Sequence, residues 1–533
     1  MLSNDSGPDH DHVAGAPVPA AAWLVPYGLG WCVFLVIELA LTSKAASRRM
    51  DWESLLAADT DSLIVLGFLL AAPIFWWLGR RPILGRASLS RWLSRSLGQP
   101  AGNLCGPAYD LLRPICFSIV VAGISLIASK TVASRFDNLP PVYHDEFSYL
   151  FQAETFLAGR VSFPSHAGAR LFDQMHVLNE GRFASRYFPG TGLWMAPFVS
   201  VGHPYWGHWL AGAICAALTF WIGRELAGDS AGLIAGLLTA LSPAMALFSN
   251  LLLAHHPTLV GLGVFILGVL RMLRLASVAW GFTAGMGLTF ALLCRPMTAA
   301  SVALPFGVYI VWWACLADVR WRRRSEDAGQ GPGPTSPPLP GRKRRLWASV
   351  AMGVPLVAGG IGLFFYDRAI TGSGWVTPYE LYTDIYTPRH VYGFNNVIRG
   401  EQHLGPRVIA NYDKWADNLT PALALGNAVT RLSASWKWTL GILPLTLALG
   451  SGFVLWRRLP RGAWLILAAI VSLHAAHIPY WFVGIEQHHY VFEGGRCGRS
   501  GRPSFRSKRF APGARLVEPG WPGGGALSWP ARL

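Results

Sequence analysis

The chain has 533 residues, of which 52% are hydrophobic and only 14% are charged. Soluble domains carry roughly a quarter charged residues, so this composition excludes an ordinary soluble protein and favours a membrane protein. The formal net charge of +16 does not indicate nucleic-acid binding. The basic residues cluster in short loops beside apolar segments, which is the pattern that orients membrane spans.

The apolar runs predict an all-α polytopic membrane protein with about eleven transmembrane helices, because a spanning helix needs about 20 mostly apolar residues. Residues 1–20 lack the basic region of a signal peptide and are expected to form a disordered tail. The predicted spans are residues 21–42, 62–79, 111–130, 207–223, 229–247, 257–273, 278–294, 297–315, 346–366, 436–456 and 462–484.

The distribution of Arg and Lys predicts how these spans are oriented. Residues 80–107 contain five Arg and no acid, and residues 317–345 and 457–461 are also strongly basic. Basic loops stay in the cytoplasm, so the N-terminus is expected inside and two long loops, 131–206 and 367–435, outside. Long loops in compact proteins are usually functional or disordered, and the many aromatic residues here favour order.

The same pattern predicts two modules joined by a linker. The N-terminal module covers residues 21–316 and the C-terminal module covers residues 346–493. Between them, residues 317–345 form a cytoplasmic linker that is rich in Gly and Pro from Gly331 to Pro338.

The outer loop 131–206 begins with a candidate catalytic segment. An amphipathic helix is predicted here at the membrane interface, with Asp145 and Glu146 at its N-terminal end. One interpretation is that Asp145 caps this helix and Glu146 complements its dipole. The other is that the two acids do acid–base chemistry on a lipid-borne substrate. The residues expected on the apolar face are Phe147, Leu150, Phe151, Leu157 and Ala158.

Cations and a turn follow in the same loop. Arg170, His176, Arg182 and Arg186 precede Tyr187-Phe188-Pro189-Gly190, which is expected to turn the chain back to the membrane. A lipid-phosphate donor needs cations at headgroup depth, and a hydroxyl acceptor needs a carboxylate base. Both residue types occur within this one segment. Each Arg alone also fits a contact with solvent or a lipid headgroup.

These features resemble a known group of enzymes. The acid pair and its Tyr-, Phe- and Gln-containing helix look like the first outer loop of polytopic glycosyltransferases with the GT-C fold. The closest types are the polyprenyl-phosphate-dependent mannosyl and aminoarabinosyl transferases of glycosyltransferase family 39 and its bacterial relatives. The Tyr-Phe-Pro-Gly turn resembles the family's aromatic-Pro-Pro-Gly turn, with Phe188 in place of a proline. Further short motifs, spread over roughly residues 110–490, are Ser249-Asn250, His255-His256-Pro257, Arg295-Pro296, Pro378-Tyr379 and Tyr392-Gly393-Phe394-Asn395.

The resemblance implies an inverting sugar transfer on the outer side of the plasma (inner) membrane. A polyprenyl-phosphate-linked sugar is the donor, and a lipid, glycan or protein is the acceptor. Asp145 would take the proton of the acceptor hydroxyl, and Glu146 would orient the acceptor or share a divalent cation. Whether a divalent cation takes part is left open, and no metal-ligating residues are assigned. Arg295, Arg186 and Arg182 would hold the donor phosphate. The residues expected to contact substrate are His144, Tyr149, Tyr187, His255 and Tyr379.

Other interpretations stay open. A transporter or flippase of lipid-linked sugars would need an internal repeat and polar residues in mid-span, and the sequence displays neither. Arg295 also fits an ordinary snorkelling arginine, and His255 a partly buried helix-end ring. Aromatic residues of loop 367–435 fit either a sugar cleft or a folded cap.

The last segment departs from this pattern. Residues 494–533 are rich in Gly, Arg and Pro and are expected to be a disordered basic tail. One hypothesis is that a reading-frame shift replaced native C-terminal helices, and the alternative is a genuine tail that contacts anionic headgroups. Sequencing the region after the Phe492 codon separates them.

Overall fold

The computed structural model describes residues 107–134, 141, 143–317, 341–401, 407–439 and 459–483. All of these belong to one compact unit, Met1–Arg499. The predicted spans 21–42 and 62–79, most of span 436–456, both predicted tails and most of the linker lie outside the described residues.

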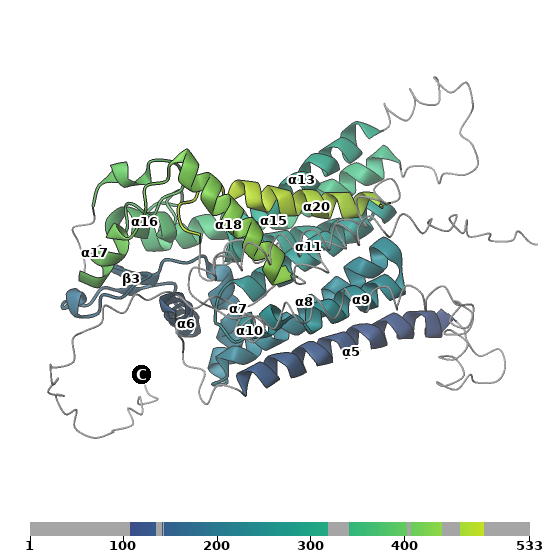
Figure 1. The fold of residues 1–533 in the computed structure, drawn as a ribbon, viewed down its shortest axis with the longest axis horizontal. Coiled ribbons are helices and arrows are strands. Elements are labelled where there is room, and N and C mark those ends of the chain that lie inside the picture. Colours follow the sequence, from purple (N-terminus) through teal and green to yellow (C-terminus); the bar gives the residue numbers. More distant parts are fainter. Residues whose placement is uncertain are drawn as a thin grey trace, which may run out of the picture. The chain divides into compact units, whose positions relative to one another are not determined.

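The described part is mostly helical, and five of its helices are long and apolar enough to cross a membrane. The chain is thus a helical membrane protein, as predicted, but eleven spans are not confirmed. The five helices are α5 (Pro107–Ala133), α8 (Pro204–Ala227), α11 (His255–Leu275), α13 (Pro296–Cys315) and α15 (Arg342–Thr371) (Figure 1).

Shorter apolar helices account for three other predicted spans. The predicted span 229–247 is wrong as a single helix, because α9 ends at Ala240 and α10 begins at Pro243. Proline has no backbone N–H to donate to the preceding turn, so it interrupts the helical hydrogen bonds. It is instead favoured at the first position of the next helix. These shorter helices are α9 (Asp229–Ala240), α10 (Pro243–Phe248), α12 (Val278–Cys294) and α20 (Arg461–Ala476).

Helices of the two predicted modules pack closely against each other. Helix α12 packs between α11 and α15. A side chain at Gly281 or Gly285 would collide with the backbone of α15, at Ala348 and Met352 respectively. Small residues let helices approach in this way inside membranes. One apolar cluster includes Phe265 of α11, Phe306 of α13 and neighbours from α15 and α20, so both predicted modules contribute to it.

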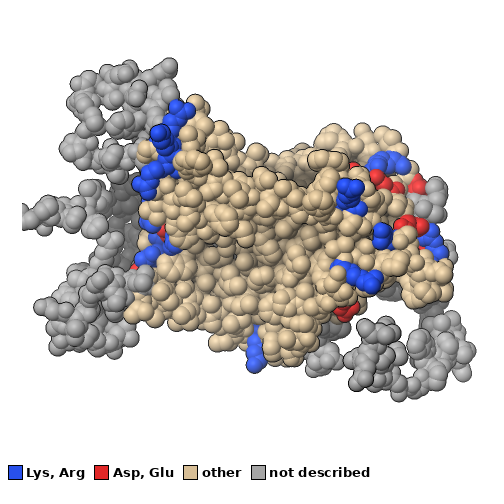
Figure 2. Space-filling model, turned by 180° about the vertical axis from the view of Figure 1, so that it is seen from behind, with Lys and Arg blue, Asp and Glu red and all other residues tan. Residues whose placement is uncertain are grey.

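The surface of the bundle carries an apolar belt. Exposed fractions reach 67% at Ile127, 65% at Val308 and 63% at Val357. Figure 2 shows a broad uncharged band on one face, with most Lys, Arg, Asp and Glu gathered towards the two ends. Exposed apolar area of this extent is typical of a surface that faces lipid rather than water.

The loop 131–206 contains the predicted helix and a small sheet. The predicted amphipathic helix is α6, and an antiparallel sheet follows it in the order β1-β3-β2, with Asn179 opposite Phe183. The prediction of an all-α fold missed this sheet, because strands of two to four residues leave too short an alternation to recognise. The elements are α6 (His144–Leu157), β1 (Phe163–Pro164), η2 (Ala169–Leu171), β2 (Val177–Glu180), β3 (Arg182–Ser185) and α7 (Pro189–Ser200).

The second long loop is also folded. Tyr382 and Tyr386 of α16 pack with Leu178 of β2 and Tyr366 of α15, so this loop covers the first one at the same end of the bundle (Figure 1). The elements are α16 (Pro378–Tyr386), η3 (Asn396–Arg399), α17 (Arg407–Lys414) and α18 (Pro421–Thr439).

Candidate functional site

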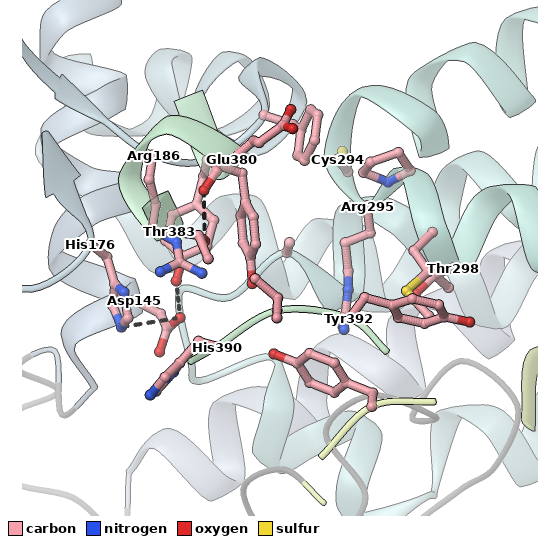
Figure 3. A pocket seen from close by; sticks show the side chains of 18 of the residues that line it. Asp145, His176, Arg186, Cys294, Arg295, Thr298, Glu380, Thr383, His390 and Tyr392 are labelled. Atoms are coloured by element: carbon pink, nitrogen blue, oxygen red, sulfur yellow. Dashed lines mark hydrogen bonds and ion pairs between the residues drawn. The ribbon is translucent and has the colours of Figure 1, made fainter. Parts of the chain in front are cut away.

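A cavity of about 490 Å³ lies where the two loops meet the helix ends. This volume is within the range of about 300–1,000 Å³ that small-molecule sites occupy. Figure 3 shows Asp145, His176 and Arg186 close together, and Arg295 apart from them beside Thr298 and Tyr392. The walls come from α6, the chain around β2 and β3, the ends of α11, α12, α13 and α20, and the second loop.

The start of α6 separates the two predicted acids. The N-cap is Tyr143, so Asp145 does not cap the helix. Asp145 lines the cavity and accepts a hydrogen bond from the Tyr187 hydroxyl. Glu146 is 1% exposed and accepts hydrogen bonds from the backbone N–H groups of Tyr143 (3.1 Å) and Leu252 (2.7 Å). Adjacent residues point about 100° apart on a helix, so one acid faces the cavity and the other ties α6 to the bundle.

Polar side chains on the buried face of α6 fix its position. Ser148 donates to the carbonyl oxygen of His176 (2.7 Å), and Gln152 donates to the carbonyl oxygen of Tyr187 (2.8 Å). Phe147 and Leu157 are instead about half exposed. The structure thus confirms a helix at the predicted position. Its polar face packs on protein, while part of the predicted apolar face is open to the surroundings.

His176 occupies a strained backbone position at the cavity wall. Its φ of 66° lies in the left-handed region, which costs a non-glycine residue roughly 1–2 kcal/mol. Three hydrogen bonds hold it there: its carbonyl oxygen accepts from Ser148 and from the Arg186 N–H, and its own N–H donates to the Tyr382 hydroxyl. Its Nε2 lies 3.9 Å from Asp145 Oδ1.

Burial controls the protonation of the polar groups here. It lowers the pKa of His176 to about 3, despite the opposing effect of Asp145, and that of His390 to about 4. Both imidazoles are therefore neutral at physiological pH. Burial and the neighbouring Asp145 raise the pKa of Tyr149 and Tyr187 well above the usual value, so both tyrosines remain protonated hydrogen-bond donors.

Arg186 is a buried cation that has no acidic partner among the described residues. It is 4% exposed and follows β3 directly. Its guanidinium lies 3.9 Å from the ring centre of Tyr379 and 4.7 Å from that of Tyr382. Within the described part of the chain, Nε and Nη1 have no hydrogen-bond partner, and no carboxylate lies within 4.0 Å of the guanidinium.

Arg295 lies at the junction between α12 and α13. Its Nη1 donates to Nδ1 of His255 at 2.5 Å. Helix α11 begins at His255 and α13 begins at Pro296, and both residues line the cavity. The first N–H groups of a helix lack partners inside it and carry partial positive charge, so two helix N-termini reinforce the cation. This corner of the cavity is suited to an anion.

The second loop and the end of α20 close the cavity. Tyr379, His390 and Tyr412 line it, together with His477 and Tyr480. The segment after α20 is held by Arg431 of α18, a nearly fully buried side chain. It donates to the carbonyl oxygens of residues 477, 480 and 482 at 2.5, 2.8 and 2.7 Å. Residues more than 300 positions apart in the sequence therefore share one wall.

Most residues predicted for the site line this one cavity. These are Asp145, Tyr149, Arg186, Tyr187, His255, Arg295 and Tyr379. Three predicted residues do not line it. Glu146 accepts hydrogen bonds from backbone N–H groups, while His144 on α6 and Arg182 on β3 have exposed side chains.

Sequence reasoning left several cavity residues out of the predicted site. His176 was noted only as a cation, and its isolated position after Asp173-Gln174-Met175 offers no recognisable pattern. Tyr412 and Tyr480 lie far along the chain from Asp145, and nothing local marks them. The described residues contain no group of three or more His, Cys, Asp or Glu side chains arranged to hold a metal ion.

Comparison of the chain with protein-family models and with curated proteins finds no match.

Proposed function

We propose that this protein is a membrane glycosyltransferase that transfers a sugar from a polyprenyl-phosphate donor to a hydroxyl group of a lipid, glycan or protein. One observation carries the proposal: a carboxylate, Asp145, shares a cavity with Arg186 and Arg295 at the end of an apolar helix bundle. A lipid-borne phosphate can reach such a cavity from the bilayer, and a carboxylate beside it can serve as a base.

In the proposed reaction the acceptor oxygen attacks the anomeric carbon of the sugar. Its proton passes to Asp145 as the new C–O bond forms. The bond between the anomeric carbon and the phosphate oxygen breaks, and the electron pair leaves with the phosphate. Arg295 and the N-terminus of α13 stabilise the charge that grows there. Attack opposite to the leaving group inverts the anomeric configuration.

The proposed side of the membrane follows from charge. Helix α15 begins with exposed Arg342, Lys343 and Arg344, and its other end packs against α16 near the cavity. Its 30 residues span about 45 Å at 1.5 Å per residue, so the basic end and the cavity end lie on opposite sides. Basic ends stay in the cytoplasm, which favours a cavity that opens on the non-cytoplasmic side.

The test uses the full chain in lipid nanodiscs, incubated with defined polyprenyl-phosphate sugars and candidate acceptors. Mass spectrometry follows the release of polyprenyl phosphate and the mass gain of the acceptor. We expect Asp145→Asn to lower the transfer rate at least about 100-fold with donor binding retained, because a general base contributes about 10²–10⁴-fold. Arg182→Gln is the matched control outside the cavity and should leave transfer unchanged. Undiminished transfer by Asp145→Asn would remove Asp145 as the base.

A further inference from the structure

Three of the described arginines line the cavity. Arg399 is paired with Asp384 at 2.7 Å, while Arg186 and Arg295 occupy different surroundings. Arg295 is bonded to His255 and lies at the start of α13. Arg186 is stacked between tyrosines of the second loop and follows β3. Figure 3 shows them well apart, with Asp145 next to Arg186. A single phosphate bound at the α13 N-terminus beside Arg295 would therefore not pair with the guanidinium of Arg186.

The tyrosine rings compensate the burial of this charge only in part. A cation over an aromatic face gains roughly 0.5–2 kcal/mol. Removing a charge from water costs several kcal/mol even after relaxation of the surrounding protein. A buried guanidinium with two unpartnered nitrogens thus fits a group that is completed by a ligand.

The shape of the site narrows the ligand chemistry. A guanidinium presents a flat fork of donors that matches a carboxylate or a phosphate with two parallel hydrogen bonds. The rings of Tyr379 and Tyr382 keep that fork in place. His176 and His390 nearby are neutral. They therefore neither repel the guanidinium of Arg186 nor supply a positive charge of their own to a bound anion.

We propose that Arg186 forms a second anion subsite, separate from a donor-phosphate subsite at Arg295, which binds an acidic group on the transferred sugar or on the acceptor. This inference rests on the proposed function and narrows its substrates to a pair that carries a carboxylate or phosphate in addition to the donor phosphate.

The experiment measures binding to the full chain in nanodiscs of neutral lipid, into which decaprenyl phosphate is titrated from zero to saturation. Saturation-transfer NMR compares three soluble probes: methyl glucuronide as the sugar carboxylate, glycerol 3-phosphate as the headgroup phosphate, and methyl glucoside as the uncharged control. The variants are Arg186→Met, Arg186→Lys and Arg295→Met. Size-exclusion profiles verify folding, and Arg186→Lys retains the charge should Arg186→Met fail to fold.

We expect one acid to bind the wild-type protein at least about tenfold more tightly than methyl glucoside, and Arg186→Met to lose this preference. Arg186→Lys should lose part of it, because an ammonium cannot form the paired hydrogen bonds. Arg295→Met should weaken decaprenyl phosphate about tenfold and the acid less than threefold. The preferred acid tells whether the group belongs to the sugar or to a phosphate-bearing acceptor.

The proposal is overturned if neither acid binds better than methyl glucoside, if Arg186→Met or Arg186→Lys binds acid like the wild type, or if decaprenyl phosphate displaces the acid one for one. Failure of the proposed function looks different: decaprenyl phosphate would not bind, or Arg295→Met would bind it normally, while the acid preference at Arg186 persisted.

Discussion

Replacing Arg186 by Met should leave the ligand-free protein as stable as the wild type or more stable. The change removes contacts with the rings of Tyr379 and Tyr382, worth roughly 0.5–2 kcal/mol each. It also removes the cost of burying a charge that no described carboxylate pairs with, which is several kcal/mol. Met fills similar space without polar atoms, so we expect a net change between zero and about 3 kcal/mol of stabilisation.

Arg431 offers a matched control, because it is also buried but donates to three carbonyl oxygens. Hydrogen bonds from charged groups contribute roughly 1.5–3 kcal/mol each, and the carbonyls would be left without these donors. Arg431→Met should therefore lower stability by several kcal/mol. The two substitutions remove the same side chain from similar depth and should act in opposite directions.

Intrinsic-fluorescence melting of the nanodisc-embedded proteins measures both variants without ligand. We expect the midpoint of Arg186→Met to equal or exceed that of the wild type, and the midpoint of Arg431→Met to fall by several degrees. If Arg186→Met destabilises the protein as strongly as Arg431→Met does, Arg186 is a structural residue and the reasoning from its missing partner fails.

Three further outcomes are expected. Glu146→Ala should lower the melting midpoint by the equivalent of about 1–3 kcal/mol, since two buried N–H groups lose their acceptor; the same midpoint as wild type would contradict this role. Tyr187→Phe should change the pH–rate profile of transfer, which is followed by mass spectrometry, because Asp145 loses a hydrogen-bond donor; an unshifted profile argues against it. Between pH 6.5 and about 3, the imidazole of residue 176 is protonated in the unfolded chain but not in the folded protein, where it is buried. The free energy of unfolding of the wild type should therefore fall as pH falls, by up to about 1.4 kcal/mol per pH unit. His176→Asn, which tolerates the left-handed backbone, should have a flatter melting curve against pH, and an equally steep curve would exclude His176 as the source.

The sequence was sufficient to predict the long helices and α6. Lipid offers no hydrogen bonds, so a spanning segment must be helical and apolar throughout its length, and this leaves a strong local pattern. The ends of α5, α8, α11, α13 and α15 accordingly lie within a few residues of the predicted spans. The break between α9 and α10 was missed although Pro243 marked it.

The candidate site was only partly predictable. Local pattern placed Asp145 at the start of an amphipathic helix, but it could not separate Asp145 from Glu146. That choice depends on which face of α6 packs against the bundle, and Ser148 and Gln152 determine the face through bonds to residues 28 and 35 positions away. Arg182 and Arg186 are equivalent by local pattern. In the structure Arg182 is exposed on β3, whereas Arg186 is buried under the second loop.

By itself, the sequence determined that the chain enters a membrane as helices and that acids and cations gather in its first long loop, because both properties are local. Only the tertiary structure decided which charges meet. The cavity joins Asp145, Arg295, Tyr379 and Tyr480, and their proximity results from helix packing and loop closure across hundreds of residues. Such long-range contacts leave no periodic trace in any one segment.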